Sequence, residues 1–207
     1  MGGNVAAAAG CAAGYVIGSV PFGLMVGKAV GGLDVRDFGS GNMGTANVLR
    51  TMGARAGALT FGLDVAKGAV AVGVARRLGA DPAAQAAAGL AACVGHSWPV
   101  FARFRGGKAV ATAAGALVMV SPEAFAFAAA GGAGGILLTK TMSVGSLAAA
   151  GLGAFGAGLD AIRTRDAVPF VFAALASTLV VVRHVPNIRR LARGEEPKLS
   201  SRLLGGA

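Results

Sequence analysis

Residues 5–26 read V-A-A-A-A-G-C-A-A-G-Y-V-I-G-S-V-P-F-G-L-M-V and contain no charged side chain. A helix that crosses a membrane needs roughly 20 predominantly apolar residues, so this stretch is long enough to do so. The whole chain has the same character: of its 207 residues, 55% are hydrophobic and 14% are charged, whereas about 25% of residues are charged in an average soluble domain. We therefore expect an integral membrane protein, because so few charges cannot cover a surface that faces water.

Six more apolar stretches follow the first, at residues 56–75, 83–94, 109–120, 124–138, 144–159 and 167–182. The second and third of these six are shorter than a straight crossing requires, so we expect them to be re-entrant or lengthened by loop residues packed inside the bundle. Small residues at four-residue spacing, such as Gly10, Gly14 and Gly18, let membrane helices approach closely. The sequence predicts an all-α integral membrane protein, a compact bundle of about seven transmembrane helices, some short or re-entrant, in a single domain over residues 1–207.

Lysine and arginine are distributed unevenly between the connections, and cytoplasmic loops retain an excess of both. The first, third and fifth connections and the C-terminal tail hold 14 of the 19 basic residues, four lie on the other side, and Lys67 lies within a stretch. We therefore expect the N-terminus outside and the C-terminus in the cytoplasm. The formal charge of +10 belongs to this cytoplasmic face, so no nucleic-acid partner is needed to explain it.

The first long polar segment, residues 34–51, reads D-V-R-D-F-G-S-G-N-M-G-T-A-N-V-L-R-T. Its glycines match the dinucleotide pattern G-x-G-x-x-G, but that fingerprint requires a preceding strand, which a membrane bundle does not supply. A glycine-rich loop with neutral side-chain donors and an arginine is suited to hold an anion. A second interpretation is a loop that caps the next helix through Thr45 or Asn47. The candidate anion-binding residues are Gly39, Ser40, Gly41, Asn42, Thr45, Asn47 and Arg50.

The second polar segment, residues 95–112, reads G-H-S-W-P-V-F-A-R-F-R-G-G-K-A-V-A-T. Its Gly-Gly-Lys run at 106–108 precedes an apolar helix, so N–H groups of the first turn and the lysine ammonium could converge on one phosphate. The run does not favour an ATP-binding loop, which would need Gly at 101 or 102 and Ser or Thr in place of Ala109. Trp98 is typical of an aromatic anchor at the membrane interface, and His96 suits a structural role as well as a chemical one.

The third polar segment, residues 184–196, reads H-V-P-N-I-R-R-L-A-R-G-E-E. A basic tail attracted to anionic lipids accounts for its arginines. It does not account for His184 and Asn187, an imidazole and an amide placed where an apolar helix leaves the membrane. We expect Pro186 to start a new helical turn, which keeps both side chains near the mouth of the bundle.

Other polar residues lie within or beside the apolar stretches. Asp64 and Lys67 are three residues apart and are expected to pair on one helix face. Ser143 and Ser146 either cap the helix of the sixth stretch or supply neutral donors to the cytoplasmic site. The nine acidic residues form no run of aspartates, and the two cysteines have no Cys or His partner at ligand spacing, so neither a metal nor a cofactor is expected.

Together and in order, these residues resemble the bacterial membrane family of acyl-phosphate-dependent glycerol-3-phosphate acyltransferases. The chain departs from that family's pattern at Ala109, where glycine is usual, at residues 45–46, which look exchanged, and at residues 185–186, where polar residues are usual. The matching positions cover almost the whole chain: residues 18–23, 39–42, 47, 50, 63–64, 67–68, 95–96, 99–104, 106–108, 110–112, 184, 187–188, 190–191, 194 and 196.

The resemblance implies transfer of a fatty acyl group from acyl phosphate to the 1-hydroxyl of glycerol 3-phosphate, giving lysophosphatidic acid and phosphate, the first acylation step of phospholipid synthesis. It implies a multi-pass acyltransferase of the bacterial inner membrane with its active site facing the cytoplasm. Its partners are the two substrates and membrane lipid, without an obligatory protein partner. The tasks of the site are to hold two repelling anions together and to stabilise charge on the reacting oxygens.

The resemblance also assigns roles to the candidate residues. His184 is a candidate general base, because an imidazole titrates near pH 6.5; alternatively, an oxygen of the acyl phosphate accepts the proton and the histidine positions substrate. The expected catalytic residues are His184, Asn187, Lys108, Ser40 and Arg50, and the expected substrate-binding residues are Gly39, Gly41, Asn42, Asn47, Gly106, Gly107, Ser143, Ser146 and Glu196.

Two other functions fit the sequence less well. A membrane transporter or channel for a phosphorylated or anionic solute also has a basic mouth and broken helices, but it predicts an internal repeat, and the two halves of this chain share no obvious motif. A phosphatidyltransferase acting on nucleotide-activated lipid should carry a run of aspartates for metal. The transporter is the chief alternative.

Overall fold

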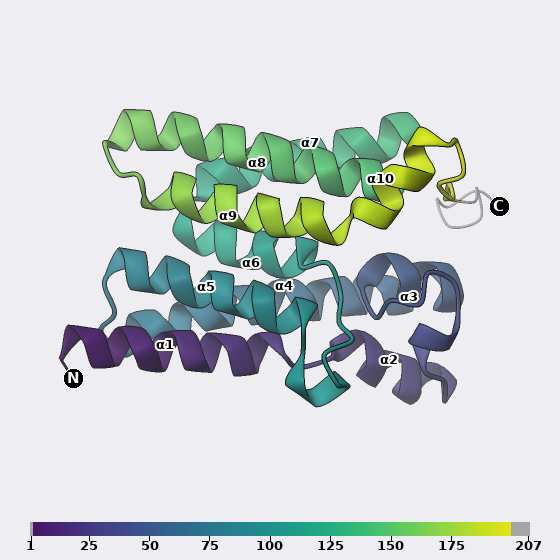
Figure 1. The fold of residues 1–207 in the computed structure, drawn as a ribbon, viewed down its shortest axis with the longest axis horizontal. Helices are drawn as coiled ribbons and strands as arrows, with labels where there is room; N and C mark the ends of the chain where they lie inside the picture. The colour runs from purple at the N-terminus through teal and green to yellow at the C-terminus, as the bar shows by residue number, and fades with distance from the viewer. Residues whose placement is uncertain (1, 200–207) are drawn as a thin grey trace.

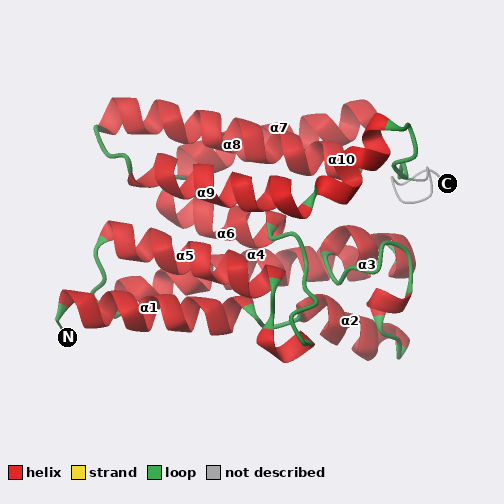
Figure 2. Ribbon diagram, viewed as in Figure 1, coloured by secondary structure: helices red, strands yellow, loops and turns green. Residues whose placement is uncertain are grey.

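The computed structural model describes residues 2–199, which form ten α-helices and two short 3-10 helices and contain no strand. The longer helices run side by side along the long axis of the molecule, which confirms the all-α bundle expected from the sequence (Figures 1 and 2). The elements are α1 (Gly3–Gly18), α2 (Phe22–Gly31), η1 (Val35–Asp37), α3 (Thr45–Met52), α4 (Ala54–Arg77), α5 (Pro82–Ser97), η2 (Val100–Ala102), α6 (Val110–Val120), α7 (Pro122–Thr139), α8 (Met142–Thr164), α9 (Val168–Arg183) and α10 (Val185–Ala192).

All seven apolar stretches are helical: the first forms α1 and α2, and the others form α4 to α9 in order. Among the described residues, three segments are long and apolar enough to cross a membrane, namely α1 with α2, α4 and α8. Helices α9 and α10 make a fourth candidate if their 60° bend is a broken span. Helix α6 has 11 residues, so the shortness expected of that stretch is found in the structure.

The first apolar stretch is broken between α1 and α2. Pro21 has no backbone N–H and cannot continue the helical ladder, so α1 ends at Gly18 and α2 begins at Phe22. The carbonyl of Val20 in this break accepts a hydrogen bond from Lys67 Nζ at 2.9 Å. Helix α4 therefore supplies a bond that the interrupted helix cannot make for itself.

Small residues place α1 directly against α5. Gly10, Gly14 and Gly18 are all buried. A Cβ atom at Gly14 would collide with the backbone of Ala88, and one at Gly18 would collide with the backbone of Ala92. The close packing expected from their four-residue spacing is therefore confirmed, since no larger side chain fits between the two helices.

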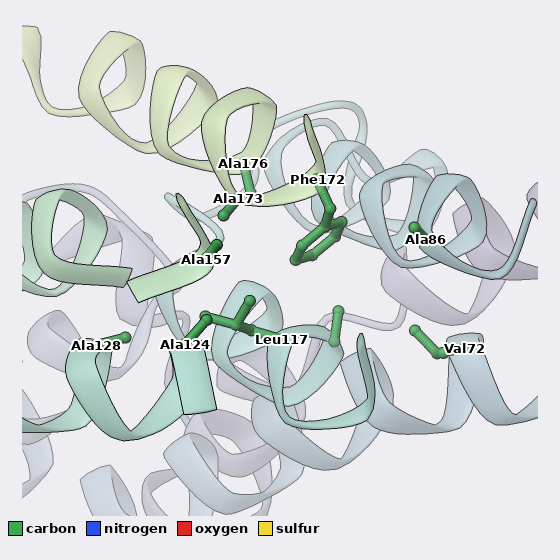
Figure 3. Packing of buried hydrophobic residues seen from close by; sticks show 10 residues of the cluster. Val72, Ala86, Leu117, Ala124, Ala128, Ala157, Phe172, Ala173 and Ala176 are labelled. Atoms are coloured by element: carbon green, nitrogen blue, oxygen red, sulfur yellow. The ribbon is translucent and has the colours of Figure 1, made fainter. Parts of the chain in front are cut away.

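The core between the two halves of the bundle is built mainly from alanine (Figure 3). Its one aromatic side chain, Phe172 of α9, is 3% exposed and points between Ala86 of α5 and Leu117 of α6. In a membrane, close packing of small side chains drives helix association, because lipid tails are as apolar as the helices. This composition therefore fits a bundle that sits in lipid.

Helices α2, α3 and α10 gather at one end of the bundle, opposite the end where α1 begins (Figure 1). Two of the polar segments belong to this end, because residues 34–51 include α3 and residues 184–196 include α10. The remaining polar segment, residues 95–112, includes the connection from α5 to α6, which runs beside α2 and α4 toward the same region (Figure 2). The fold thus brings together segments that are far apart in the sequence.

Candidate active site

The three polar segments surround two adjoining cavities. The inner one has a volume of about 100 Å³ and the outer one about 300 Å³. Ser40, Asn42 and Lys108 line both. The inner cavity is also lined by Asn47, Arg50, Asp64, His96, Ser143, Ser146 and His184, and the outer one by Trp98, Arg183, Asn187 and Arg190.

A chain of polar contacts joins Lys108 to the C-terminal segment. Lys108 Nζ donates to Asn187 Oδ1 at 2.5 Å, and Asn187 Nδ2 donates to Glu196 Oε1 at 2.6 Å. The second carboxylate oxygen, Glu196 Oε2, accepts from Arg190 Nε at 2.7 Å. Burial raises the pKa of Glu196, but the hydrogen bonds from Asn187 and Arg190 outweigh it and leave this pKa below its usual value. Glu196 is therefore an ionised carboxylate that holds the side chain of Asn187. It does not contact Lys108 directly, because Asn187 lies between them.

Two cations, Lys108 and Arg50, face the inner cavity. Burial lowers the pKa of Lys108 to about 8, and nearby Arg190, Arg50 and Arg183 act in the same direction against Glu196. Burial likewise lowers the pKa of Arg50, whose buried Nε has no hydrogen-bond partner within residues 2–199. Because positive charges gather here without an acidic partner in direct contact with Lys108 or Arg50, the cavity favours an anion.

The side chain of Asn47 holds the loop of residues 38–40 in shape. Its Oδ1 accepts from the Ser40 N–H at 2.9 Å, and its Nδ2 donates to the carbonyls of Val35 and Phe38 at 2.7 and 3.1 Å. Both N–H groups of the amide and one of the two lone pairs of its oxygen are thus used within the protein. Asn47 lines the inner cavity, but its contacts are those of a residue that shapes the Ser40 loop.

The second interpretation of this segment, a helix cap by Thr45 or Asn47, was wrong for α3. The helix begins at Thr45 and its N-cap is Gly44, with no side-chain cap bond. The Gly44 N–H instead donates to Asn42 Oδ1 at 2.7 Å. Asn42 therefore stabilises the loop that precedes α3, and neither Thr45 nor Asn47 caps the helix.

The run of residues 106–108, called the glycine strand below although it is a loop that pairs in no sheet, crosses the end of α5. The Gly107 N–H donates to the carbonyl of His96 at 2.9 Å, so the expectation that this N–H binds phosphate needs correction: the donor is already used. A Cβ at Gly107 would strike the ring of His96, and one at Gly106 would strike the His96 carbonyl. The two glycines are required by this close approach, and Lys108 remains the anion-binding group of the run.

Ala109 follows Lys108 with φ of 61°, in the left-handed region. Alanine is strained there by roughly 1–2 kcal/mol, whereas glycine is not. The departure from glycine noted at Ala109 therefore affects the local backbone geometry of this turn. It also turns the chain sharply from the glycine strand into α6.

His184 lies at the junction of α9 and α10. Its Nδ1 is 2.8 Å from the carbonyl of Val180. A carbonyl can only accept, so Nδ1 carries the proton in the neutral ring and Nε2 carries a free lone pair. This is the tautomer that a general base or a hydrogen-bond acceptor for a hydroxyl would need. Pro186 lies in the first turn of α10, as expected.

Ser143 and Ser146 belong to the first turns of α8, beside the cavity. The N-cap of α8 is Thr141, so neither serine caps the helix, and that alternative was wrong. Ser146 Oγ donates to the carbonyl of Met142 at 2.9 Å, while Ser143 is 3% exposed. Both nevertheless lie in the cavity wall as neutral polar groups.

The expected pair of Asp64 and Lys67 is confirmed, with Nζ 2.9 Å from Oδ1. The structure adds His96, whose Nδ1 lies 3.5 Å from the same Asp64 oxygen. All three side chains are buried. The pair thus connects the break after α1 to the histidine beneath the glycine strand, which local spacing in the sequence did not reveal.

An apolar groove of about 390 Å³ continues from the inner cavity between α6, α7, α8 and α9. The groove and the inner cavity share Phe61, Val110, Met142 and Ser146. Its walls are largely alanine and glycine, with Leu117, Phe125 and Phe172 among the larger lining residues. Sequence reasoning did not find this groove, because its alanines look like any other helix-packing residues.

Arg183, Arg190 and Trp98 are also cavity residues that were not among the expected site residues. Arg190 is among the positions that resemble the family, whereas the signal of Arg183 in the sequence is its position directly before His184. Within residues 2–199, no three His, Cys, Asp or Glu side chains gather as metal ligands do.

The chain is similar to known proteins over nearly its full length. Residues 8–194 match the family model described as glycerol-3-phosphate acyltransferase. A glycerol-3-phosphate acyltransferase of Anaeromyxobacter dehalogenans is 46% identical over 192 residues, covering 91% of this chain and 94% of that protein. One of Rubrobacter xylanophilus is 43% identical, covering 93% and 95%.

Two solved structures have the same fold. Both are of PlsY (YgiH), an integral membrane glycerol 3-phosphate acyltransferase. Its glycerol 3-phosphate form has a TM-score of 0.86 and 33% identity, covering 97% of this chain and 99% of that one. Its lysophosphatidic acid form has a TM-score of 0.82 and 32% identity, covering 96% and 97%. By sequence and by fold, the chain belongs to the glycerol-3-phosphate acyltransferase family.

Proposed function

We propose that this protein transfers a fatty acyl group from acyl phosphate to the 1-hydroxyl of glycerol 3-phosphate, giving lysophosphatidic acid and phosphate. The observation that carries the proposal is the continuity of a basic cavity with an apolar groove through Phe61, Val110, Met142 and Ser146. An acyl phosphate has the same two parts, an alkyl chain and a phosphate joined at the reacting carbonyl. Both substrates bring phosphate, and the relatives and the PlsY forms support glycerol 3-phosphate as the acceptor.

The two cavities suit the two substrates. The acyl phosphate lies with its chain in the groove and its phosphate in the inner cavity, near Arg50 and Ser146. Glycerol 3-phosphate lies in the outer cavity near Asn187 and Arg190. Lys108 lines both cavities and so reduces the repulsion between the two phosphates. Ser40 and Asn42 add neutral groups on the same boundary.

The chemical step is one direct transfer. The glycerol oxygen forms a bond to the acyl carbon, the bond from that carbon to the phosphate oxygen breaks, and inorganic phosphate leaves with the bonding electrons. The hydroxyl proton goes to His184 Nε2 or to a phosphate oxygen of the donor. Lys108 and Asn187 stabilise negative charge on the reacting oxygens. The step requires no metal and no covalent enzyme intermediate, because phosphate is already a good leaving group.

The placement in the membrane belongs to the same proposal. Residues 1–207 form one acyltransferase domain with about seven crossings, in the bacterial inner membrane, with the N-terminus outside and the C-terminus and active site at the cytoplasm. The distribution of 14 basic residues on one side against four on the other supports this orientation. So does the position of α10 at the opposite end of the bundle from the start of α1.

The test is a product assay with purified protein. Glycerol 3-phosphate is incubated with palmitoyl phosphate and, in parallel, with palmitoyl-CoA, and lysophosphatidic acid is measured. Product from the acyl phosphate, abolished in Lys108→Ala, is the expected result. Product from palmitoyl-CoA alone would replace the donor, and no product from either would leave the transport alternative to explain the basic mouth.

A second measurement decides the fate of the proton. His184→Gln keeps a hydrogen-bonding side chain, but an amide cannot accept a proton near neutral pH. If His184 is the general base, kcat falls by roughly 100-fold or more. A near-normal rate and pH profile would assign the proton to the donor phosphate and leave His184 the role of positioning substrate.

A further inference from the structure

Two groups hold the glycine strand between α5 and α6 from opposite sides. Arg183 Nε donates to the Gly107 carbonyl at 3.0 Å, and Arg183 Nη2 donates to the Gly106 carbonyl at 3.3 Å. On the other side, the carbonyl of His96 accepts from the Gly107 N–H at 2.9 Å. The peptide between Gly106 and Gly107 is therefore bonded at both its oxygen and its nitrogen.

These bonds fix the direction in which Lys108 leaves the strand. In a trans peptide the carbonyl and the N–H point in opposite directions, so holding the Gly107 carbonyl toward Arg183 turns the N–H of Lys108 away from it. The glycines have no side chains that could replace these hydrogen bonds in holding the strand. The orientation of Lys108, which ends 2.5 Å from Asn187 Oδ1, thus depends on groups outside the strand.

Arg183 is itself held in a fixed position. Its guanidinium carbon lies 5.2 Å from the centre of the Trp98 ring, a cation–π contact. The carbonyl of Trp98 accepts from the Tyr15 hydroxyl at 2.9 Å, which ties this residue to α1. A planar guanidinium can stack on a ring and donate to two carbonyls at once, whereas a lysine ammonium cannot reproduce that fork.

We propose that Arg183 is a positioning residue of the phosphate site, which orients Lys108 by clamping the carbonyls of Gly106 and Gly107 against His96. The role rests on the proposed function for its substrate. It differs from that of a cation which touches phosphate directly, because it depends on the shape of the guanidinium and not only on its charge.

Matched variants separate shape from charge. Arg183→Lys keeps the positive charge and loses the fork, and Arg183→Ala loses both. We expect kcat/KM for glycerol 3-phosphate to fall by roughly 100-fold in both, since a displacement of about 1 Å at a reacting group costs this much. Arg189→Ala removes an exposed arginine of α10 and should stay near the wild-type value. Added methylguanidinium should restore part of the activity of Arg183→Ala and none of that of Arg183→Lys, where the longer side chain still fills the site.

A second readout does not need turnover. Trp98 is the single tryptophan of the chain, so its fluorescence reports on the cation–π contact. Titration of the wild type with inorganic phosphate should change this fluorescence with a saturable curve. The curve should move to at least tenfold higher phosphate in Arg183→Lys and be lost in Lys108→Ala.

The possible results divide cleanly. Wild-type kinetics and phosphate affinity in Arg183→Lys would overturn the clamp and leave Arg183 only the role of a positive charge. Wild-type behaviour of Arg183→Ala would show that its charge is not needed either. If the wild type makes no lysophosphatidic acid but its phosphate titration still depends on the guanidinium of Arg183, the proposed function fails and the clamp stands. Should Arg183→Ala fail to fold, Arg183→Lys and Arg183→Gln decide the same question.

Discussion

Lys108 Nζ donates to the side-chain oxygen of Asn187 at 2.5 Å, which joins the glycine strand to a helix 79 residues further along the chain. The lysine thus contacts a neutral amide, and the carboxylate of Glu196 lies beyond that amide. Within residues 2–199, Lys108 forms no ion pair with a carboxylate. Its charge therefore remains available to a phosphate, and several measurable consequences depend on this arrangement.

The pH dependence of acyl transfer should report the titration of Lys108. Burial lowers its pKa to about 8, so the ammonium is charged below that pH and lost above it. We expect kcat/KM for glycerol 3-phosphate to fall about tenfold per unit above pH 8. An alkaline limb near pH 10, the range of an ordinary lysine, would contradict the prediction. Lys108→Arg should lack the limb at pH 8, because an arginine stays charged throughout.

Removing the charge of Glu196 should move that limb further down. The carboxylate favours the charged form of Lys108 through space, against burial and the nearby arginines. In Glu196→Gln this support disappears, and the pKa of Lys108 falls further below its ordinary value. The measurable result is an alkaline limb at lower pH than in the wild type, with activity at pH 6.5 reduced less than activity at pH 8. Glu195→Gln, one residue earlier and exposed, is the control. An unmoved limb in Glu196→Gln would show that Asn187 insulates the lysine from the carboxylate.

A single methyl group at Gly107 should disable the site. The added Cβ would strike the ring of His96, so the strand must shift and carry Lys108 with it. We expect Gly107→Ala to lose at least 100-fold in kcat/KM. Gly134→Ala in α7, where a Cβ meets nothing within 4 Å, should keep full activity and gain slightly in thermal stability. Wild-type kinetics in Gly107→Ala would mean that the strand is not held as closely as the contact with His96 indicates.

The parts of the fold that follow from local patterns could be predicted from the sequence. Uncharged runs such as residues 5–26 form helices, here broken at residues 19–21, because a backbone in lipid must satisfy its own hydrogen bonds. The four-residue spacing of Gly10, Gly14 and Gly18 is visible without a structure. The three polar segments could likewise be grouped on one face, because positive charge sorts the connections. Asp64 and Lys67 could be paired because they lie three residues apart on one helix.

The parts that depend on contacts between distant residues could not be predicted. Arg183 and Gly107 are 76 residues apart, and no local pattern in either segment predicts their hydrogen bond. The bond from the Gly107 N–H to the His96 carbonyl is equally invisible, which is why that N–H was wrongly expected to hold phosphate. Caps were misplaced at α3 and α8 because local spacing does not fix the residue at which a helix begins: the N-caps are Gly44 and Thr141, and neither helix has a side-chain cap bond.

The position of the groove indicates that substitutions in α7 should change which acyl-chain lengths the protein accepts. Its wall along α8 runs from Met142 to Gly153, which at 1.5 Å per residue is roughly 16 Å. An extended chain advances about 1.2 Å per bond, so roughly 13 bonds of the acyl chain fit against this wall. Ala129 lines the groove partway along. Ala129→Phe should therefore lower kcat/KM for palmitoyl phosphate by about tenfold or more and leave that for octanoyl phosphate nearly unchanged. Ala130→Phe places the same ring on the next residue of α7, which is exposed but does not line the groove, and should alter neither. Equal losses on both donors in Ala129→Phe would exclude the groove as the acyl-chain site, because only a chain that reaches past Ala129 can be obstructed there.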